Sequence, residues 1–328
     1  MEERQTLTGV MCRSLSGLDR VFATDPPDMA IVQGDTLAVA AGAMAAFFHQ
    51  VPAGHVEAGL RTNNRYGPFP EEMNRRLAAQ LCTVHFAPTT LAKENLIHDG
   101  VPEENIYLTG NTATDAIKWI AENRGDPEDL ALTPLGQSQS IPFKELISRE
   151  RLIAVTAHRR ENIPDRLRQI CEALRRICER DDVGVVFAVH PGPAVRDIVA
   201  PILGHLENVA LVEPPDYADF ASIMVASYFV LTDSGGLQEE APTLKKPILV
   251  VRETTERPEG VDAGVARLIG TQTDTIIAEA SKLLDDPNHY AAMTGPPNPY
   301  GDGECSPRIL RSILHFFGRA NRPVDIGT

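Results

Sequence analysis

Hydrophobic and polar positions along the chain follow a repeating unit: a short apolar run rich in β-branched residues, a polar turn, and a stretch of helical length. The first clear unit runs from residues 29–33 through a turn with the potential helix caps Asp35 and Thr36 into an Ala-rich stretch at 37–49. This alternation favours an α/β fold in which helices cover parallel sheets. In the first part of the chain we expect strands at 29–33, 53–57, 83–88 and 106–109.

The pattern lapses between about residues 123 and 148, where Gly, Pro, Ser and Gln cluster as in a crossing between domains. Beyond it we expect strands at 151–156, 184–190, 208–212, 228–232 and 247–251, with helices at 164–180, 216–226 and 236–244. The sequence thus predicts two doubly wound Rossmann-like domains, residues 1–147 and 148–305, with a cleft between them. An amphipathic helix within residues 306–328 is expected to cap the first domain.

Composition narrows the classes of function. Of 328 residues, 43% are hydrophobic. The chain has 31 Lys+Arg and 45 Asp+Glu, which gives a net charge of −14. This negative charge disfavours binding to nucleic acid or to an anionic membrane. Any bound anion therefore needs a local positive site. Five scattered cysteines without C-x-x-C spacing suggest reduced thiols and a cytoplasmic protein. The longest apolar stretch, 37–48, is too short to span a bilayer, so neither a signal peptide nor a membrane anchor is expected.

Residues 228–240 carry the strongest phosphate-binding pattern. An apolar run leads into Ser234, Gly235 and Gly236, where a helix is expected to begin. Backbone N–H groups at a glycine-rich helix start attract anions, so a diphosphate fits this place. Glu240, about one turn later, could accept hydrogen bonds from a ribose diol. The alternative is a simple Gly-Gly turn with a surface glutamate.

A second cluster follows the run at 151–156, where His158, Arg159 and Arg160 come at the end of the expected strand. Arginines pair bidentately with phosphate oxygens, and an imidazole can donate to the oxygen of a leaving diphosphate. Arg257, in another loop after a strand, is a further candidate phosphate contact. Alternatively, the arginines are a solvated helix start and the histidine a cap.

The first domain supplies carboxylates. Asp35 and Glu57 follow expected strands, and Glu71 opens the helix after Pro70. Carboxylates gathered in one place can take separate acid and base roles, because their pKa values are pushed apart. Each also has a structural explanation: Asp35 as a helix cap, Glu71 in a helix first turn, and Glu57 as a partner of Arg61. The chain has no G-x-G-x-x-G, Walker A or H-E-x-x-H pattern, so neither a cofactor nor a metal is implied.

These blocks together resemble the non-hydrolysing UDP-N-acetylglucosamine 2-epimerases, a family with the two-domain glycosyltransferase-B fold. The resemblance begins near Gln5 and runs to the C-terminus, and it rests on Val32-Gln-Gly-Asp-Thr36, His55-Val-Glu-Ala-Gly-Leu-Arg-Thr62, Pro70-Glu-Glu-Met-Asn-Arg75, Gly110-Asn-Thr112, Thr156-Ala-His-Arg-Arg-Glu-Asn162, Asp233-Ser-Gly-Gly-Leu-Gln-Glu-Glu240 and Thr254-Thr-Glu-Arg-Pro-Glu259. Members of the family open with βα units and a Gly-Thr-Arg-Pro-Glu turn. We therefore expect roughly two or three leading βα units to be missing, so that the first domain is N-terminally incomplete.

The resemblance implies interconversion of UDP-GlcNAc and UDP-ManNAc by elimination and re-addition of UDP. It implies catalytic roles for Asp35, Glu57, Glu71 and His158. The residues expected to bind UDP are Arg159, Ser234, Gly235, Gly236, Glu240 and Arg257. The partner is a UDP-sugar, and a homodimer is possible. Two alternatives remain: a nucleotide-sugar-binding remnant without turnover, and a hydrolysing 2-epimerase or related glycosyltransferase.

Overall fold

The computed structural model describes residues 5–124, 130–146, 148–159 and 162–327. The chain forms two compact units: unit 1 comprises Met1–Asp115 and Tyr300–Thr328, and unit 2 comprises Ala116–Pro299. Within the described residues, no helix has the length and apolar character needed to cross a membrane.

Unit 1 is built on a four-stranded parallel sheet with the strand order β1-β2-β3-β4. Its elements are α1 (Leu7–Thr24), β1 (Ala30–Gln33), α2 (Leu37–Phe48), β2 (Ala53–Val56), α3 (Glu71–Leu81), β3 (Val84–Ala87), α4 (Thr90–His98), β4 (Ile106–Leu108), the first residues of α5 (Thr112–Asn123) and α14 (Cys305–Phe316). Helix α1 is an element that the alternation of strands and helices does not indicate.

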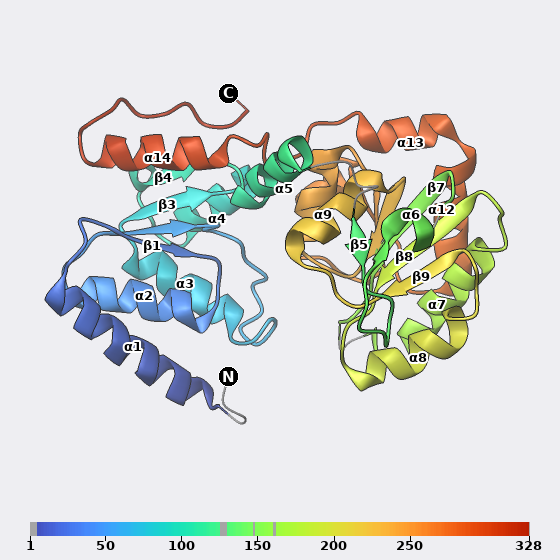
Figure 1. Cartoon of the computed structure of the whole chain (residues 1–328). Coiled ribbons are helices and arrows are strands. Elements are labelled where there is room, and N and C mark those ends of the chain that lie inside the picture. Colours follow the sequence, from blue (N-terminus) through green and yellow to red (C-terminus); the bar gives the residue numbers. More distant parts are fainter. Residues whose placement is uncertain (1–4, 125–129, 147, 160–161, 328) are drawn as a thin grey trace. The chain divides into compact units, whose positions relative to one another are not determined.

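Helices cover both faces of this sheet (Figure 1). Small residues let α2 pack closely, since a Cβ at Gly42 would lie only 2.8 Å from the side chain of Val32. On the opposite face, Cys305 and Ile309 of α14 join a buried cluster with Phe86 and Tyr107. The segment after residue 300 therefore completes the core of unit 1, although it is far from that core in sequence.

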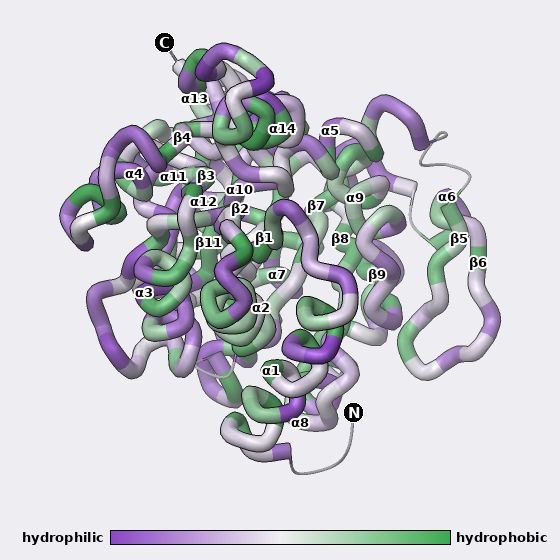
Figure 2. The backbone as a smooth tube through the Cα atoms, turned by 90° about the vertical axis from the view of Figure 1, so that its left-hand side faces the viewer, coloured by the Kyte–Doolittle hydropathy of each residue, from purple (hydrophilic) through white to green (hydrophobic). Residues whose placement is uncertain are grey.

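Unit 2 is built on a six-stranded parallel sheet with the strand order β12-β11-β10-β7-β8-β9. Its elements are the rest of α5, β5 (Ala131–Leu132), β6 (Ile141–Pro142), α6 (Phe143–Leu146), β7 (Arg151–Thr156), α7 (Asp165–Ile177), β8 (Val183–Ala188), α8 (Pro193–Leu203), β9 (Val209–Val212), α9 (Tyr217–Ala226), β10 (Phe229–Thr232), α10 (Leu237–Glu240), β11 (Ile248–Val250), α11 (Pro258–Asp262), β12 (Ala266–Leu268), α12 (Thr273–Asp285) and α13 (Pro287–Thr294). Hydrophobic colour runs along the central strands β7 and β8 (Figure 2).

Counted from β7, this order is the doubly wound 3-2-1-4-5-6 arrangement, whose direction reverses between β7 and β10. The parallel α/β architecture expected from the sequence pattern is therefore present. Ligands of open α/β sheets bind outside the carboxyl ends of the strands at such a reversal. The residues that follow Thr156 and Thr232 stand at this place in unit 2.

Two local features differ from the sequence pattern. The helix expected at 236–244 is a single α-turn, α10, followed by a 3-10 helix over Ala241–Leu244, and Pro242 lies in that second piece. The division between units falls at Asp115 and Ala116, before the stretch 123–148. Ile117 and Ile120 of α5 pack in a core cluster of unit 2, so that core begins before the change in composition.

Candidate active site

In unit 1, Asp35 lies in the turn after β1, and three side chains hold this turn. Asn74 Nδ2 donates to the Asp35 carbonyl oxygen over 2.8 Å, and the buried Arg75 forms an ion pair with the Asp35 carboxylate. On the other side, His55 Nε2 lies 2.8 Å from the carbonyl oxygen of Gly34. Thr36, rather than Asp35, is the N-cap residue of α2. Asp35 is therefore oriented by contacts from α3 and not by the helix that it precedes.

Glu57 follows β2 and has a φ of +63°, a left-handed conformation that a non-glycine residue rarely adopts. Strained backbone of this kind concentrates at functional sites. A Cβ at Gly34 would lie 3.7 Å from Glu57 Oε2, so the Glu57 carboxylate is close to the turn that carries Asp35. The structure thus places Glu57 next to Gly34, the residue that precedes Asp35, within unit 1.

Glu71, the third predicted acid, is the first residue of α3 and is partly buried. Asn74 and Arg75, which hold the Asp35 turn, lie one helical turn further along. The same helix therefore carries Glu71 and orients Asp35. The structural alternative for Glu71, a favourable position in the first turn of a helix, is also satisfied.

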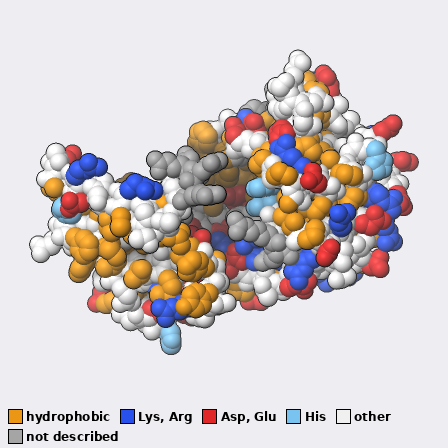
Figure 3. Space-filling view, turned by 90° about the horizontal axis from the view of Figure 1, so that it is seen from below, with side chains coloured by type: hydrophobic (Ala, Val, Ile, Leu, Met, Phe, Trp, Pro, Cys, Tyr) orange, Lys and Arg blue, Asp and Glu red, His pale blue; other side chains and the backbone are white. Residues whose placement is uncertain are grey.

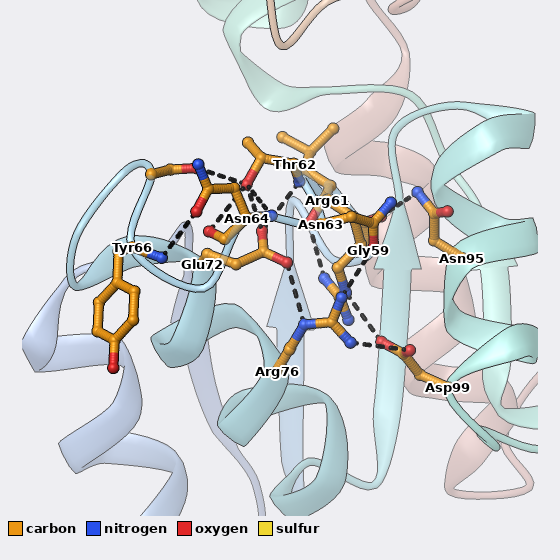
Figure 4. A network of polar contacts seen from close by, with 12 residues as sticks. Gly59, Arg61, Thr62, Asn63, Asn64, Tyr66, Glu72, Arg76, Asn95 and Asp99 are labelled. Carbon is orange, nitrogen blue, oxygen red and sulfur yellow. Dashed lines mark hydrogen bonds and ion pairs between the residues drawn. The ribbon is translucent and has the colours of Figure 1, made fainter.

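The neighbouring Glu72 ties down the loop that leads to Glu71 (Figure 4). Its buried Oε2 accepts hydrogen bonds from the backbone N of Thr62 at 2.9 Å and from Thr62 Oγ1 at 3.2 Å. Its Oε1 accepts from Arg76 Nε at 3.0 Å. Burial alone would raise the pKa of Glu72, but the hydrogen bonds from Thr62 and Arg76 outweigh it and lower that pKa. Sequence reasoning did not single out Glu72.

Asp99 extends this network beneath the loop. Its carboxylate accepts from Arg61 Nε at 2.8 Å and from Arg76 Nη1 at 3.2 Å. Arg61, the residue suggested as a structural partner of Glu57, therefore pairs with Asp99 and also donates to the Leu60 carbonyl. The loop after β2 is fixed to α3 and to the end of α4 by charged hydrogen bonds.

Two histidines lie side by side in the strands beneath this site. His55 of β2 is paired in register with His85 of β3, and both are buried. Burial lowers the pKa of His55 to about 4 and that of His85 to about 3. Both rings are therefore neutral near pH 7, so His55 serves the Gly34 turn as a hydrogen-bonding group and not as a charge.

In unit 2, a cavity of about 290 Å³ opens at the reversal between β7 and β10. Its walls combine apolar groups with a few polar ones: Thr156, His158, Ala188, His190, Pro191, Pro214, Pro215, Phe220, Ser234 and Leu237. Mostly apolar concave sites with a few directed polar groups are typical of binding sites for small molecules. The structure therefore brings His158 and Ser234 to one pocket.

Asp233 anchors His158 and Arg159. Its buried Oδ2 accepts from the backbone N of both residues at 2.8 Å. Its Oδ1 lies 3.4 Å from His158 Nδ1, and the ring of His190 stacks on His158 with centroids 5.7 Å apart. Asp233 at the Nδ1 edge and His190 on one face thus orient the His158 ring. Arg160, the second arginine of this motif, lies outside the described residues.

Ser234, Gly235 and Gly236 form the turn between β10 and α10. The backbone N of Ser234 donates to Thr232 Oγ1 at 2.9 Å. A Cβ at Gly235 would lie 2.9 Å from Glu256 Oε1 and 3.3 Å from Arg257 Nη1. The charged ends of Glu256 and Arg257 therefore lie close to the Gly235 backbone, and a larger residue here would displace them.

Glu240 lies below this turn, since a Cβ at Gly236 would be 3.9 Å from Glu240 Oε1. The side chain is 8% exposed, and Oε2 has no hydrogen-bond partner among the described residues. Burial and the charge of Glu239 raise the pKa of Glu240 to about 7, whereas the Tyr217 hydroxyl donates to Oε1 at 3.4 Å and opposes this shift. An unpaired buried carboxylate oxygen is a suitable acceptor for a ligand hydroxyl.

Arg257 Nε donates to Glu239 Oε1 at 2.8 Å, and Arg159 Nη2 donates to Glu256 Oε1 at 3.1 Å. Both predicted phosphate-binding arginines of unit 2 therefore pair with glutamates. The sequence did not predict these pairs. The pairing depends on loops that are distant in the chain, so no local signal could have shown it.

Within the described part of the chain, no cluster of three or more His, Cys, Asp or Glu side chains could hold a metal ion.

Residues 1–314 match the family model described as UDP-N-acetylglucosamine 2-epimerase. This match starts at residue 1, and the expectation that leading βα units are missing is not borne out by it. The chain is 44% identical over 326 residues to the UDP-N-acetylglucosamine 2-epimerase of Bacillus subtilis, covering 99% of this chain and 82% of that protein.

Two solved structures are similar. An S. aureus protein in a co-structure with UDP has a TM-score of 0.88 and 41% identity, covering 99% of this chain and 86% of that one. The UDP-GlcNAc 2-epimerase of Neisseria meningitidis, bound to UDP-GlcNAc, has a TM-score of 0.83 and 36% identity, covering 96% of this chain and 84% of that one.

Proposed function

The chain belongs to the UDP-N-acetylglucosamine 2-epimerase family, and from this premise we propose that it interconverts UDP-GlcNAc and UDP-ManNAc. The observation that carries the proposal is the pocket of unit 2, which lies at the reversal of a doubly wound sheet and is lined by His158 and Ser234. A pocket in this place suits the uridine end of the substrate. The S. aureus relative was solved with UDP, which supports this assignment.

We assign UDP binding to the polar groups around this pocket. The diphosphate is held at the turn of Ser234, Gly235 and Gly236 by Arg159 and Arg257, and the unpaired oxygen of Glu240 accepts from the ribose diol. The ring of His158, held at its Nδ1 edge by Asp233, donates to the diphosphate oxygen that leaves C1. The apolar wall with Pro214, Pro215 and Phe220 packs against the uracil ring.

The chemistry at the sugar requires proton transfer at C2, and we assign it to the carboxylates of unit 1. A C2 proton beside an acetamido group is too weakly acidic to be removed by itself, so its removal must accompany C1–O cleavage. One carboxylate takes the C2 proton, the C–H electrons form the C1–C2 double bond, and the C1–O electrons leave with UDP. The intermediate is 2-acetamidoglucal.

In the second half of the reaction, a carboxylic acid delivers a proton to the opposite face of C2, and the UDP oxygen bonds to C1 again. Asp35 or Glu71 serves one proton transfer and Glu57 the other. The contacts of Asn74, Arg75 and His55 support this assignment, because they hold the Asp35 turn beside Glu57 in a fixed orientation.

The test is to incubate the full chain with UDP-GlcNAc in D2O and to analyse the products by NMR and mass spectrometry. We expect both UDP-sugars, with deuterium at C2. Free ManNAc and UDP as products would identify a hydrolysing 2-epimerase instead. A folded protein that binds UDP but exchanges no C2 proton would be a nucleotide-sugar-binding remnant, and the proposal of turnover would be wrong.

We also propose that the protein acts as a homodimer in the cytoplasm. Hydrophobic side chains gather on the face of unit 1 seen in Figure 3, and Val21 of α1 and Phe47 and Phe48 of α2 are more than half exposed. Exposed apolar groups that lie together favour association. All five cysteines are free thiols, which suits a reducing compartment.

A further inference from the structure

Three arginines of unit 2 converge on the carboxylate of Glu256. Arg252 Nη1 is 2.7 Å from Glu256 Oε2, while Arg159 Nη2 and Arg257 Nη1 are 3.1 and 3.3 Å from Oε1. These residues come from the loop after β7 and the loop after β11. Two of the three, Arg159 and Arg257, are the cations assigned above to the diphosphate.

Arg252, Arg257 and Glu256 are largely removed from water, whereas the side chain of Arg159 is 34% exposed. The side chains of Arg252 and Arg257 are 7% and 9% exposed, and that of Glu256 is 18% exposed. Burial alone would raise the pKa of Glu256, but the charges of Arg257 and Arg252 outweigh it and hold the pKa at about 2. Glu256 is therefore an anion at every physiological pH, and its attraction to the arginines is weakly screened.

The anion also lies against the turn assigned to the diphosphate. Glu256 Oε1 is 2.9 Å from the position that a Cβ of Gly235 would occupy. One carboxylate oxygen thus contacts the glycine turn and two arginines at once. This set of neighbours, a glycine backbone and guanidinium groups, is the set that recognises a phosphate oxygen.

We propose that Glu256 is a built-in counter-anion that occupies the phosphate-binding arginines of the unliganded protein and exchanges them with the diphosphate of the nucleotide. This inference rests on the proposed function, because it takes the nucleoside diphosphate as the ligand. When the diphosphate arrives, Arg159 and Arg257 turn from Glu256 to the phosphate oxygens. Arg252, four residues before Glu256, keeps the carboxylate paired.

Two consequences follow from this exchange. The arginines are held in place before the ligand binds, which lowers the ordering cost of binding. At the same time each arginine gives up one ion pair with Glu256 to gain one with a phosphate oxygen, so the net gain from the diphosphate is small. Glu256 therefore weakens the binding of UDP and prevents it from being held too tightly for release.

The experiment measures UDP binding by titration calorimetry for the wild-type chain and for Glu256→Gln. Glutamine keeps the shape of the side chain but removes its charge, so Arg159 and Arg257 lose the attraction of Glu256, while Arg257 keeps its hydrogen bond to Glu239. We expect the Kd for UDP to fall by about ten-fold, the equivalent of one charged hydrogen bond. Binding of uridine, which carries no phosphate, should not change.

Glu253→Gln is the matched control, since it removes the same charge from an exposed position in the same loop. Its Kd for UDP should stay within about two-fold of wild type, because exposed charges interact weakly. If Glu256→Gln fails to fold, Glu256→Asp provides the test, because a shorter side chain withdraws the carboxylate from Arg159. That variant should bind UDP more tightly than wild type by a smaller factor.

The outcomes separate this inference from the function on which it rests. If wild-type protein binds UDP and the Glu256 variants bind it equally well or more weakly, Glu256 only positions the arginines and the counter-anion role is wrong. A gain of the same size for uridine would also contradict it, because the effect would not involve phosphate. If wild-type protein binds no UDP, the proposed nucleotide site itself is wrong, and not only the role of Glu256.

Discussion

At the scale of single residues, two glutamates beside the proposed nucleotide pocket of unit 2 have opposite protonation behaviour. Arginines keep Glu256 charged, whereas burial and the charge of Glu239 raise the pKa of Glu240 to about 7. Tyr217 faces Glu240 as a hydrogen-bond donor. Glu240 therefore gains a proton near neutral pH in the unliganded protein, while Glu256 does not.

This difference predicts the effect of Glu240→Gln on stability. The pKa of Glu240 in the folded protein lies above its usual value of 4.5. The folded state thus binds a proton that the unfolded chain releases, and wild-type stability falls as the pH rises from about 4.5 through 7. Glutamine does not titrate, so at pH 8 the variant should exceed wild type in free energy of unfolding by roughly 1–3 kcal/mol.

Urea denaturation at pH 5 and pH 8 measures the effect. The advantage of Glu240→Gln should be present at pH 8 and nearly absent at pH 5. The exposed Glu207 provides the control, because Glu207→Gln should change stability little at either pH. A variant with the same advantage at both values would show that Glu240 is not the group that titrates.

At the scale of elements, the first turn of α3 separates two tasks between adjacent glutamates. Glu72 holds the loop from Thr62, whereas Glu71 is one of the two residues, with Asp35, proposed for one proton transfer. Glu72→Gln removes an ionised acceptor from three hydrogen bonds and should lower the free energy of unfolding by about 1–3 kcal/mol. Glu71→Gln should leave stability nearly unchanged, and it should abolish turnover where Glu71, and not Asp35, carries the proton.

The stability loss of Glu72→Gln should depend on pH in a defined direction. The pKa of Glu72 is lowered in the folded protein, so its stabilisation is present above the ordinary value of 4.5 and is lost as the pH falls below it. Urea denaturation at pH 7 and pH 4 tests this, with hydrogen exchange reporting on residues 59–70. Equal stability of the Glu71 and Glu72 variants at pH 7 would contradict this division of tasks.

At the scale of the whole molecule, the apolar face of unit 1 predicts the state of assembly. Phe47 and Phe48 are 58% and 67% exposed at the end of α2. Light scattering should give twice the mass of one chain for wild type, and Phe48→Ser should shift the protein toward the monomer, because it removes apolar area from the interface. Leu310→Ser, at an exposed position on α14, is the control and should remain dimeric. A wild-type monomer at micromolar concentration would refute the dimer.

Much of this protein was determined by local sequence, because strand period, glycine turns and helix starts are short-range properties. Most strands of both units, and the positions of Asp35, His158 and Ser234 just after strands, could be predicted in this way, whereas α1, α8, β12 and α12 were not. The sequence also shows which side chains carry charge, so it could predict carboxylates as site residues in unit 1 and cations as site residues in unit 2.

Only the tertiary structure decided which polar groups meet. Arg159 and Glu256 are 97 positions apart in the chain, and Asp35 and Asn74 are 39 apart, yet both pairs are in hydrogen-bond contact. Such contacts depend on the order and register of strands, which bring distant loops to one edge of a sheet. A sequence pattern fixes the direction of a side chain relative to its own strand or helix, but not the neighbour that packing places opposite it.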